Sequence, residues 1–465
     1  MTQPAVVPAA APTRRNTELL LLLFAIAVSI AGYAAVTLTV TGEMPADLAT
    51  HGLGLAAVLV VAHLVVRRVA PYADPLILPA VALLNGIGIV VIHRLDLAEL
   101  TKEGKAATSP LTGQALGQLT WTAIGVALFV TVLALVRDHR LLARYTYTAM
   151  VVGLGLLLLP LVPGLGVTIN GSRIWIRLAG LSFQPAEVAK IVLMVFFAGY
   201  LVAKRDVLAL ASRRFLGIDL PRARDLGPIA VVWGVSLAIL VLERDLGTSV
   251  LFFASFVMLL YVATERRSWL IIGALMVSVG GWTAYQLFGH VRNRVDIWLH
   301  PFDDPTGRSF QLVQGLYSLA DGGLLGTGLG QGRPDLVPYA NTDFILTAIG
   351  EELGLTGLLA VLVLYLVLVE RGIRTAIAAR DTFGKLFAAG LSFILGLQVF
   401  VIVGGVTRLI PLTGLTTPFL SYGGSSLVAN WALVALLLRI SDIARRPAPA
   451  PAPPVAEAVT QVVRL

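Results

Sequence analysis

An acidic pair followed by proline, Asp303-Asp304-Pro305, stands in a polar stretch, residues 289–342, between two strongly apolar runs. Proline and glycine in F-D-D-P-T-G favour a tight turn that fixes the direction of a carboxylate. Three arginines flank the pair: Arg292, Arg294 and Arg308. Nearby cations favour the ionised carboxylate, which suits a general base or a metal ligand. Asp304 is our candidate base, and a solvated turn residue is the alternative.

A second charged pair, Glu187 and Lys190 in Q-P-A-E-V-A-K, opens an apolar run that Pro185 is well placed to begin as a helix. Their i,i+3 spacing puts both side chains on one helix face, one turn below the outer surface. A charge inside the membrane costs roughly 2.5–3.5 kcal/mol on insertion scales, so such residues usually face a cavity or one another. The pair is therefore a structural ion pair, part of a cavity for a lipid head group, or both.

Three acidic residues mark a later apolar run, T-D-F-I-L-T-A-I-G-E-E-L-G, which contains Asp343, Glu351 and Glu352. Eight residues of helix span about 12 Å, which places the two glutamates well inside the bilayer. Such a pair could be the proton or cation site of a transporter. It could equally cap broken helices or bind a partner arginine, and the sequence favours neither interpretation.

Two outward-facing segments could contact an anionic group. The G-T-G-L-G-Q-G run, residues 326–332, lacks the Lys-Ser/Thr of a P-loop and follows no predicted strand, so a nucleotide site is disfavoured. Its N–H groups could approach a diphosphate, and a flexible loop is the alternative. Arg173 and Arg177 share an outer face with Trp175 and could clamp a head group, whereas the tryptophan is typical of an interface anchor.

Composition sets the class of protein. Hydrophobic residues make up 57% of the chain and charged residues 13%, far below the roughly 25% of soluble proteins. Repeated apolar runs indicate an all-α polytopic membrane protein of about twelve transmembrane helices. The predicted spans lie near 17–40, 51–66, 74–93, 115–136, 146–164, 185–203, 227–242, 248–264, 269–288, 343–369, 386–406 and 415–438.

Charge and cysteine content narrow the function further. With both termini in the cytoplasm, most of the 35 Lys and Arg residues fall on the cytoplasmic side, so the net charge of +8 reflects membrane topology and not nucleic-acid binding. The absence of cysteine excludes thiolate metal sites, and the six histidines show no metal-binding spacing. We expect one membrane domain, residues 17–442, with an extracytoplasmic loop at 289–342. The tails, 1–16 and the Pro/Ala-rich 443–465, are predicted to be disordered.

Six ordered segments resemble the SEDS family (shape, elongation, division and sporulation proteins, including RodA and FtsW). They are N-G-S-R-I-W-I-R with F-Q-P-A-E-V-A-K, R-D-L-G-T-S, D-D-P-T-G-R-S-F-Q-L-V-Q-G, G-T-G-L-G-Q-G, T-D-F-I-L-T-A-I-G-E-E-L-G and P-L-T-G-L-T-T-P-F-L-S-Y-G-G-S-S. The chain departs from the family at Asn341, where a histidine is usual, and at Glu243-Arg244, where Gln-Pro is usual. The family core has ten spans, so we expect two extra helices, near 51–66 and 74–93.

The resemblance implies a peptidoglycan glycosyltransferase that polymerises lipid II into β-1,4-linked glycan at the outer face of the bacterial cytoplasmic membrane. Asp304 corresponds to the family's catalytic aspartate, and Glu187 and Lys190 to its functional acid and base. The donor would be a glycan on undecaprenyl diphosphate, and the implied partner is a class B penicillin-binding protein. Candidate groups for the leaving diphosphate are Arg173, Arg177, Lys190, Arg292, Arg294 and Arg308. The sequence specifies no cofactor, although a divalent cation, Mg²⁺ or Mn²⁺, would suit a diphosphate.

Two other functions compete with the enzyme. A lipid II flippase or ion-coupled transporter would use Glu351 and Glu352 as its proton site, but it would not need Asp304 outside the bilayer. A scaffold that only anchors a partner would leave the intramembrane charges unexplained. Within the enzyme hypothesis, the absence of a long cytoplasmic tail favours a RodA-like elongation enzyme over an FtsW-like division enzyme.

Overall fold

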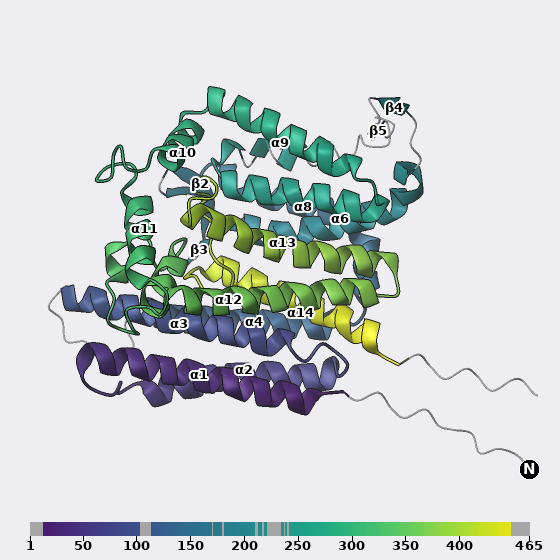
Figure 1. Ribbon diagram of the computed structural model, residues 1–465. Helices are drawn as coiled ribbons and strands as arrows, with labels where there is room; N and C mark the ends of the chain where they lie inside the picture. Colours follow the sequence, from purple (N-terminus) through teal and green to yellow (C-terminus); the bar gives the residue numbers. More distant parts are fainter. Residues whose placement is uncertain are drawn as a thin grey trace, which may run out of the picture.

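A bundle of long helices forms the protein (Figure 1). The computed structural model describes residues 13–102, 113–169, 171–178, 181–209, 213–215, 218–220, 234–236, 238–239 and 241–447. Within these residues, eleven helical segments are long and apolar enough to cross a membrane. The predicted all-α, multi-pass membrane architecture is thereby confirmed. The predicted span at 227–242 lies largely outside the described residues.

Each spanning segment overlaps a predicted run. The segments are α1 (Arg15–Thr41), α2 (Leu48–Val69), α3 (Ile77–Lys102), α4 (Gln114–Leu135), α5 (Thr146–Leu158, extended by the 3-10 turns η1, His139–Tyr145, and η2, Leu159–Leu161), α6 (Pro185–Ala209), α8 (Leu246–Thr264), α9 (Ser268–Leu287), α12 (Ile345–Ala378), α13 (Thr382–Val406) and α14 (Gly424–Arg445). Helices α3 and α12 end nine residues later than predicted, and α14 begins nine residues later. Pro185 begins α6 as expected, because proline lacks the N–H that a first-turn residue would leave unbonded.

The polar stretch 289–342 is not an irregular loop. It folds into α10 (Gly289–Leu299), α11 (Phe310–Gly322) and the short turn η3 (Pro334–Leu336) at one end of the bundle, here called the loop end (Figure 1). The sequence prediction missed both helices because they are short and flank turn-forming residues. The turn that carries Asp304 is therefore held between two helices, α10 and α11.

Two small antiparallel sheets accompany the helices. One consists of β1 (Gly166–Ile169), β2 (Ser172–Leu178) and β3 (Leu181–Phe183) at the loop end, and the other of β4 (Arg213–Phe215) and β5 (Ile218–Leu220). Trp175 of β2 pairs in register with Val167 of β1. The first sheet connects α5 to α6, so it determines how the chain enters the helix that carries Glu187 and Lys190.

The first helix is fastened at the opposite end of the bundle, here called the terminal end. Arg15 of α1 donates hydrogen bonds to Glu18 and to the carbonyl oxygen of Ala73, between α2 and α3. His63 Nδ1 of α2 lies 2.7 Å from Glu18 Oε1. All three charged or titratable side chains are buried. Since buried charges persist only when they are paired, these contacts hold α1, α2 and the following turn together.

The last helix reaches the same turn. Arg445 of α14 pairs with the buried carboxylate of Asp74, and the backbone N–H of Tyr72 donates to Asp442 Oδ1 at 2.8 Å. The described chain thus begins and ends at the terminal end of the bundle (Figure 1). We call this group the terminal clasp; its members are Arg15, Glu18, His63, Asp74, Asp442 and Arg445.

Candidate active site at the loop end of the bundle

Asp304 lies in the turn that precedes α11. Its Oδ2 accepts a hydrogen bond from the backbone N–H of Arg308 at 3.0 Å, and Arg308 Nε lies 3.6 Å away. The side chain is 43% exposed. The backbone hydrogen bond from Arg308, together with its guanidinium, lowers the pKa of Asp304. The carboxylate is therefore ionised, accessible and fixed in direction, as a general base requires.

Glu187 and Lys190 form a buried ion pair on α6. Lys190 Nζ donates to Glu187 Oε2 at 2.6 Å and to Gln398 Oε1 of α13 at 3.1 Å. The amide of Gln398 in turn donates to the carbonyl oxygen of Thr416 at 2.8 Å. The i,i+3 pairing expected from the sequence is present. Gln398 was not predicted, because no local pattern indicates which residue of a distant helix will face Lys190.

Asp245 extends this polar group towards α8. Its carboxylate caps α8 by accepting the N–H of Thr248 at 3.0 Å, and Gln184 Nε2 lies 3.5 Å from it. Burial raises the pKa of Asp245, while hydrogen bonds to Thr248 and the charge of Arg294 oppose that rise. The R-D-L-G-T-S segment was the sequence signal for this cap. Glu187, Lys190 and Asp245 therefore lie within one electrostatic neighbourhood.

Arg294 joins the loop to the bundle. Its Nη1 donates to the carbonyl oxygens of Leu412 and Thr413 at 3.0 and 3.1 Å. Burial lowers the pKa of Arg294, and Asp245 and Asp343 oppose this as opposite charges. A small cavity of about 10 Å³ lies beside it, with Asp343 and Thr413 in its lining. Of the predicted loop arginines, Arg294 is the one whose side chain reaches the polar group around Asp245.

Asp343 precedes α12 instead of lying within it. Its carboxylate accepts from Thr342 Oγ1 at 3.0 Å and lies 3.5 Å from Gln311 Nε2 of α11. Burial raises the pKa of Asp343. This carboxyl group was expected inside the tenth span and is found at the loop end, where it can face a substrate.

The remaining candidate arginines are dispersed. Arg173 Nη2 donates to the carbonyl oxygen of Val162 at 3.2 Å, and Arg177 is exposed on β2. Arg292 donates to the carbonyl oxygen of Gln286 at 3.1 Å and lies over the ring of Tyr285. In the described part of the chain these arginines form no ion pair with Asp304 or Glu187. The backbone N–H of Arg173 donates to the carbonyl oxygen of Glu243 at 3.2 Å, close in sequence to Asp245. The assignment of these arginines to a diphosphate site stays a prediction.

Glu243 is an acid that the sequence analysis did not assign to the site. It is 1% exposed, and its Oε1 has no hydrogen-bond partner within the described residues. Burial and the neighbouring Asp245 raise the pKa of Glu243 to about 8. The departure from Gln-Pro at this position was the signal. A protonated carboxyl group resembles the amide of glutamine in shape and, like it, is uncharged and can donate a hydrogen bond.

The glycine run does not form an open anion cradle. The N–H groups of Thr327 and Gly328 donate to the carbonyl oxygens of Glu351 and Glu352 at 2.9 and 3.0 Å. Gly330 N–H donates to Glu352 Oε2 at 3.0 Å. These donors are used inside the protein, so the predicted diphosphate contact here is wrong.

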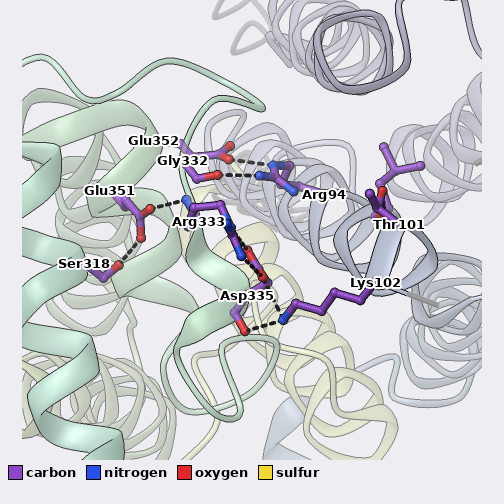
Figure 2. A network of polar contacts seen from close by, with 10 residues as sticks. Arg94, Thr101, Lys102, Ser318, Gly332, Arg333, Asp335, Glu351 and Glu352 are labelled. Atoms are coloured by element: carbon purple, nitrogen blue, oxygen red, sulfur yellow. Dashed lines mark hydrogen bonds and ion pairs between the residues drawn. The ribbon is translucent and has the colours of Figure 1, made fainter. Parts of the chain in front are cut away.

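Glu351 and Glu352 are buried structural acids (Figure 2). Arg94 of α3 donates to Glu352 Oε1 and to the carbonyl oxygen of Gly332, both at 2.7 Å. Ser318 of α11 donates to Glu351 Oε2 at 2.6 Å. Of the two interpretations left open above, these contacts match the partner arginine and not a proton site. Gly354, with φ of 68°, breaks α12 just beyond the pair.

No metal site is built from protein ligands alone in the described ranges, since no three His, Asp or Glu side chains are placed to hold one ion. Mg²⁺ typically binds through one or two carboxylates together with substrate phosphates. The carboxylates of Asp245, Asp304 and Asp343 fit that lesser requirement, but not a complete cage.

Comparisons with known proteins decide the family. The family described as cell cycle proteins (FtsW, RodA and SpoVE) matches residues 74–446. The chain belongs to this family. Peptidoglycan glycosyltransferase RodA of Mycobacterium tuberculosis is 51% identical over 464 residues, 99% of this chain and 98% of the relative. The probable peptidoglycan glycosyltransferase FtsW of Geobacter sulfurreducens is 34% identical over 378 residues, 81% of this chain and 96% of the relative.

Solved structures of the FtsW/RodA/SpoVE type agree with the fold. A chain from work on "structural coordination of polymerization and crosslinking by a peptidoglycan synthase complex" is 28% identical, with a TM-score of 0.62 over 81% of this chain and 99% of that chain. A variant of the Thermus thermophilus rod shape determining protein RodA is 25% identical, with a TM-score of 0.52 over 79% of this chain and 97% of that one. The predicted family and enzyme class are confirmed.

The match also corrects the position of the extra helices. It begins at residue 74, so α3 belongs to the family core. The additional elements are α1 and α2, which precede the core as one hairpin, and not the spans near 51–66 and 74–93. Apolar periodicity could not distinguish these possibilities, because all three helices satisfy the same hydropathy.

Proposed function

We propose that this protein polymerises lipid II into β-1,4-linked glycan at the outer face of the bacterial cytoplasmic membrane, in the service of cell elongation. The observation that carries the proposal is that an exposed, ionised Asp304 on the loop lies at the same end of the bundle as two cationic side chains, the buried Lys190 and the half-buried Arg294. The similarity to RodA over nearly the whole chain supports elongation over the FtsW-like alternative.

Asp304 would act as the base. It would take the proton from the 4-hydroxyl of the acceptor GlcNAc as that oxygen attacks the anomeric carbon of the donor glycan. The bond from that carbon to the lipid diphosphate breaks with inversion, and the diphosphate leaves with the electron pair. A positioned base contributes about 10²–10⁴-fold.

The leaving diphosphate requires positive charge. The candidates are the buried Lys190, the half-buried Arg294 and the exposed Arg308 beside Asp304. A divalent cation, Mg²⁺ or Mn²⁺, would add a Lewis acid at the diphosphate, with Asp343 or Asp245 as a protein ligand. Arg173, Arg177 and Arg292 would serve the glycan or the membrane surface.

A transpeptidase partner completes the proposal. Glycan strands must be cross-linked, and one of the similar structures carries polymerization and crosslinking in its description. We infer a class B penicillin-binding protein as that partner, bound within the membrane.

The test is polymerisation by the purified protein with that partner in lipid II-containing vesicles. We expect glycan polymer from wild type and a loss of at least about 10²-fold in Asp304→Ala. Asp303→Ala is the matched control and should retain activity. Undiminished polymer from Asp304→Ala would refute the role of that residue. Lipid II scrambling without polymer would favour the flippase.

A further inference from the structure

We propose that the part of α1 at the loop end of the bundle positions the turn that carries Asp304. In this arrangement α1 supports the glycine segment (Gly326–Gly332), which holds α11, and α11 in turn holds the turn that carries Asp304. The inference rests on the function proposed above. It assigns a role to the α1–α2 hairpin, which precedes the family match.

The first step is the contact between α1 and the glycine segment. Leu329 packs on a buried cluster formed by Tyr33 and Val36 of α1 with Val90 and Leu97 of α3. This contact places an apolar side chain of the loop against the hairpin and the family core at once. Movement of α1 away from α3 would therefore remove the apolar surface on which Leu329 packs.

Gly330 sets the closeness of that approach. A Cβ atom at this residue would lie 3.0 Å from Thr39 Cβ and 3.2 Å from Val40 Cγ2, both on α1. Its φ is +80°, a conformation that glycine adopts without steric cost. The backbone of the glycine segment thus lies directly against α1. We call the contacts of Leu329 and Gly330 with α1 the seat.

The second step passes from the glycine segment to α12. The N–H of Gly330 donates to Glu352 Oε2 at 3.0 Å. Arg94 donates to the other oxygen of the same carboxylate (Figure 2). Glu352 is buried, so its charge keeps both donors in place. The seat on α1 and the charge pair on α3 therefore hold one short segment from two directions.

The third step leads to Asp304. Ser318 of α11 donates to Glu351 Oε2 at 2.6 Å, next to the held segment. Two residues just before α11 close the turn: Ser309 N–H donates to the carbonyl oxygen of Asp304 at 3.3 Å, and Arg308 N–H donates to its Oδ2 at 3.0 Å. A shift of α11 must therefore carry Asp304 with it. Misplacement of a reacting group by about 1 Å can cost 10²-fold in rate.

Leu329→Ala tests the seat kinetically. We expect about a tenfold lower kcat for glycan polymerisation, with KM within about twofold of wild type, because positioning and not binding is lost. Leu325→Ala is the matched control, since Leu325 is 81% exposed and should behave as wild type. Wild-type kcat in Leu329→Ala would overturn the proposal.

A disulfide tests the seat without reference to activity. The chain has no cysteine, so Thr39→Cys with Gly330→Cys introduces one defined pair. The two Cβ atoms would lie 3.0 Å apart, slightly closer than the roughly 3.5–4.5 Å that is usual in a disulfide. A small shift of the loop away from α1 would bring them into that range. We expect efficient cross-linking on oxidation. The oxidised protein should retain at least about half the activity of its reduced form, because the glycine segment packed against α1 is the working geometry.

The outcomes separate the two proposals. Absence of the disulfide in folded protein would overturn the seat. So would an oxidised protein that is inactive and recovers on reduction, since the segment would then have to leave α1 during turnover. A wild-type protein that makes no polymer would refute the proposed function, while the yield of the disulfide would still report on the seat.

Discussion

Lys190 Nζ lies 2.6 Å from Glu187 Oε2, and both side chains are buried on α6. Removal of one partner leaves an uncompensated buried charge, which typically costs 3–5 kcal/mol. We therefore expect Glu187→Gln to lower stability by about that amount. The double variant Glu187→Gln with Lys190→Met should recover much of the loss. Thermal unfolding in detergent is measured for wild type, Glu187→Gln, Lys190→Met and the double variant, and simple additivity of the two single changes would contradict the pairing.

The pH dependence of the reaction should reflect the contact between Asp304 and Arg308. Since Arg308 lowers the pKa of Asp304, the carboxylate stays ionised at and above its ordinary value of 3.8. We expect Arg308→Ala to raise that pKa and to move the acid limb of kcat/KM to higher pH. Arg333→Ala is the matched control, because both arginines are 65% exposed. The backbone N–H of residue 308, the larger cause of the lowered pKa, is kept in Arg308→Ala. An unmoved limb in that variant would therefore contradict a contribution of the guanidinium to the pKa of Asp304.

The buried carboxyl group of Glu243 should make the stability of the folded protein depend on pH. Its pKa of about 8 lies above the ordinary value of 4.5, so the folded state keeps the proton while the unfolded state loses it. Stability should consequently fall as pH rises from about 4.5 to about 8 and then level off. Glu243→Gln removes this dependence, so the Tm difference between Glu243→Gln and wild type should grow across that window. A constant difference between pH 5 and 8 would show that Glu243 is already ionised.

The pair formed by Arg94 and Glu352 should behave as a unit. Glu352→Gln leaves the buried guanidinium of Arg94 without an opposite charge, and Arg94→Met leaves Glu352 with only the N–H of Gly330. We expect each change to cost several kcal/mol and the double variant to cost less than their sum. Urea unfolding of the four proteins supplies the cycle. If Glu352→Gln kept full stability, the structural role of that carboxylate would be wrong.

Local patterns predicted what local geometry determines. The i,i+3 spacing was sufficient to place Glu187 beside Lys190. Hydropathy located the eleven spans found in the described residues, although α3 and α12 end nine residues later than predicted and α14 begins nine residues later. Local patterns could not predict partners that come from distant helices. Gln398 is 208 residues from Lys190, and Arg94 is 258 residues from Glu352. The glycine run was misread for the same reason. Its composition indicates exposed N–H donors, but only the folded chain determines which acceptor they meet.

The terminal clasp has a consequence for biogenesis. Asp74 meets Arg445 across 371 positions of sequence, and Tyr72 meets Asp442 across 370. A chain that emerges from the ribosome from its N-terminus can insert the α1–α2 hairpin early, but Asp74 meets its arginine partners only after Arg371 of α12 and Arg445 of α14 have followed. Completion of the last helix therefore closes the terminal clasp, and a truncated product that lacks α12 and α14 would leave the carboxylate of Asp74 without either arginine.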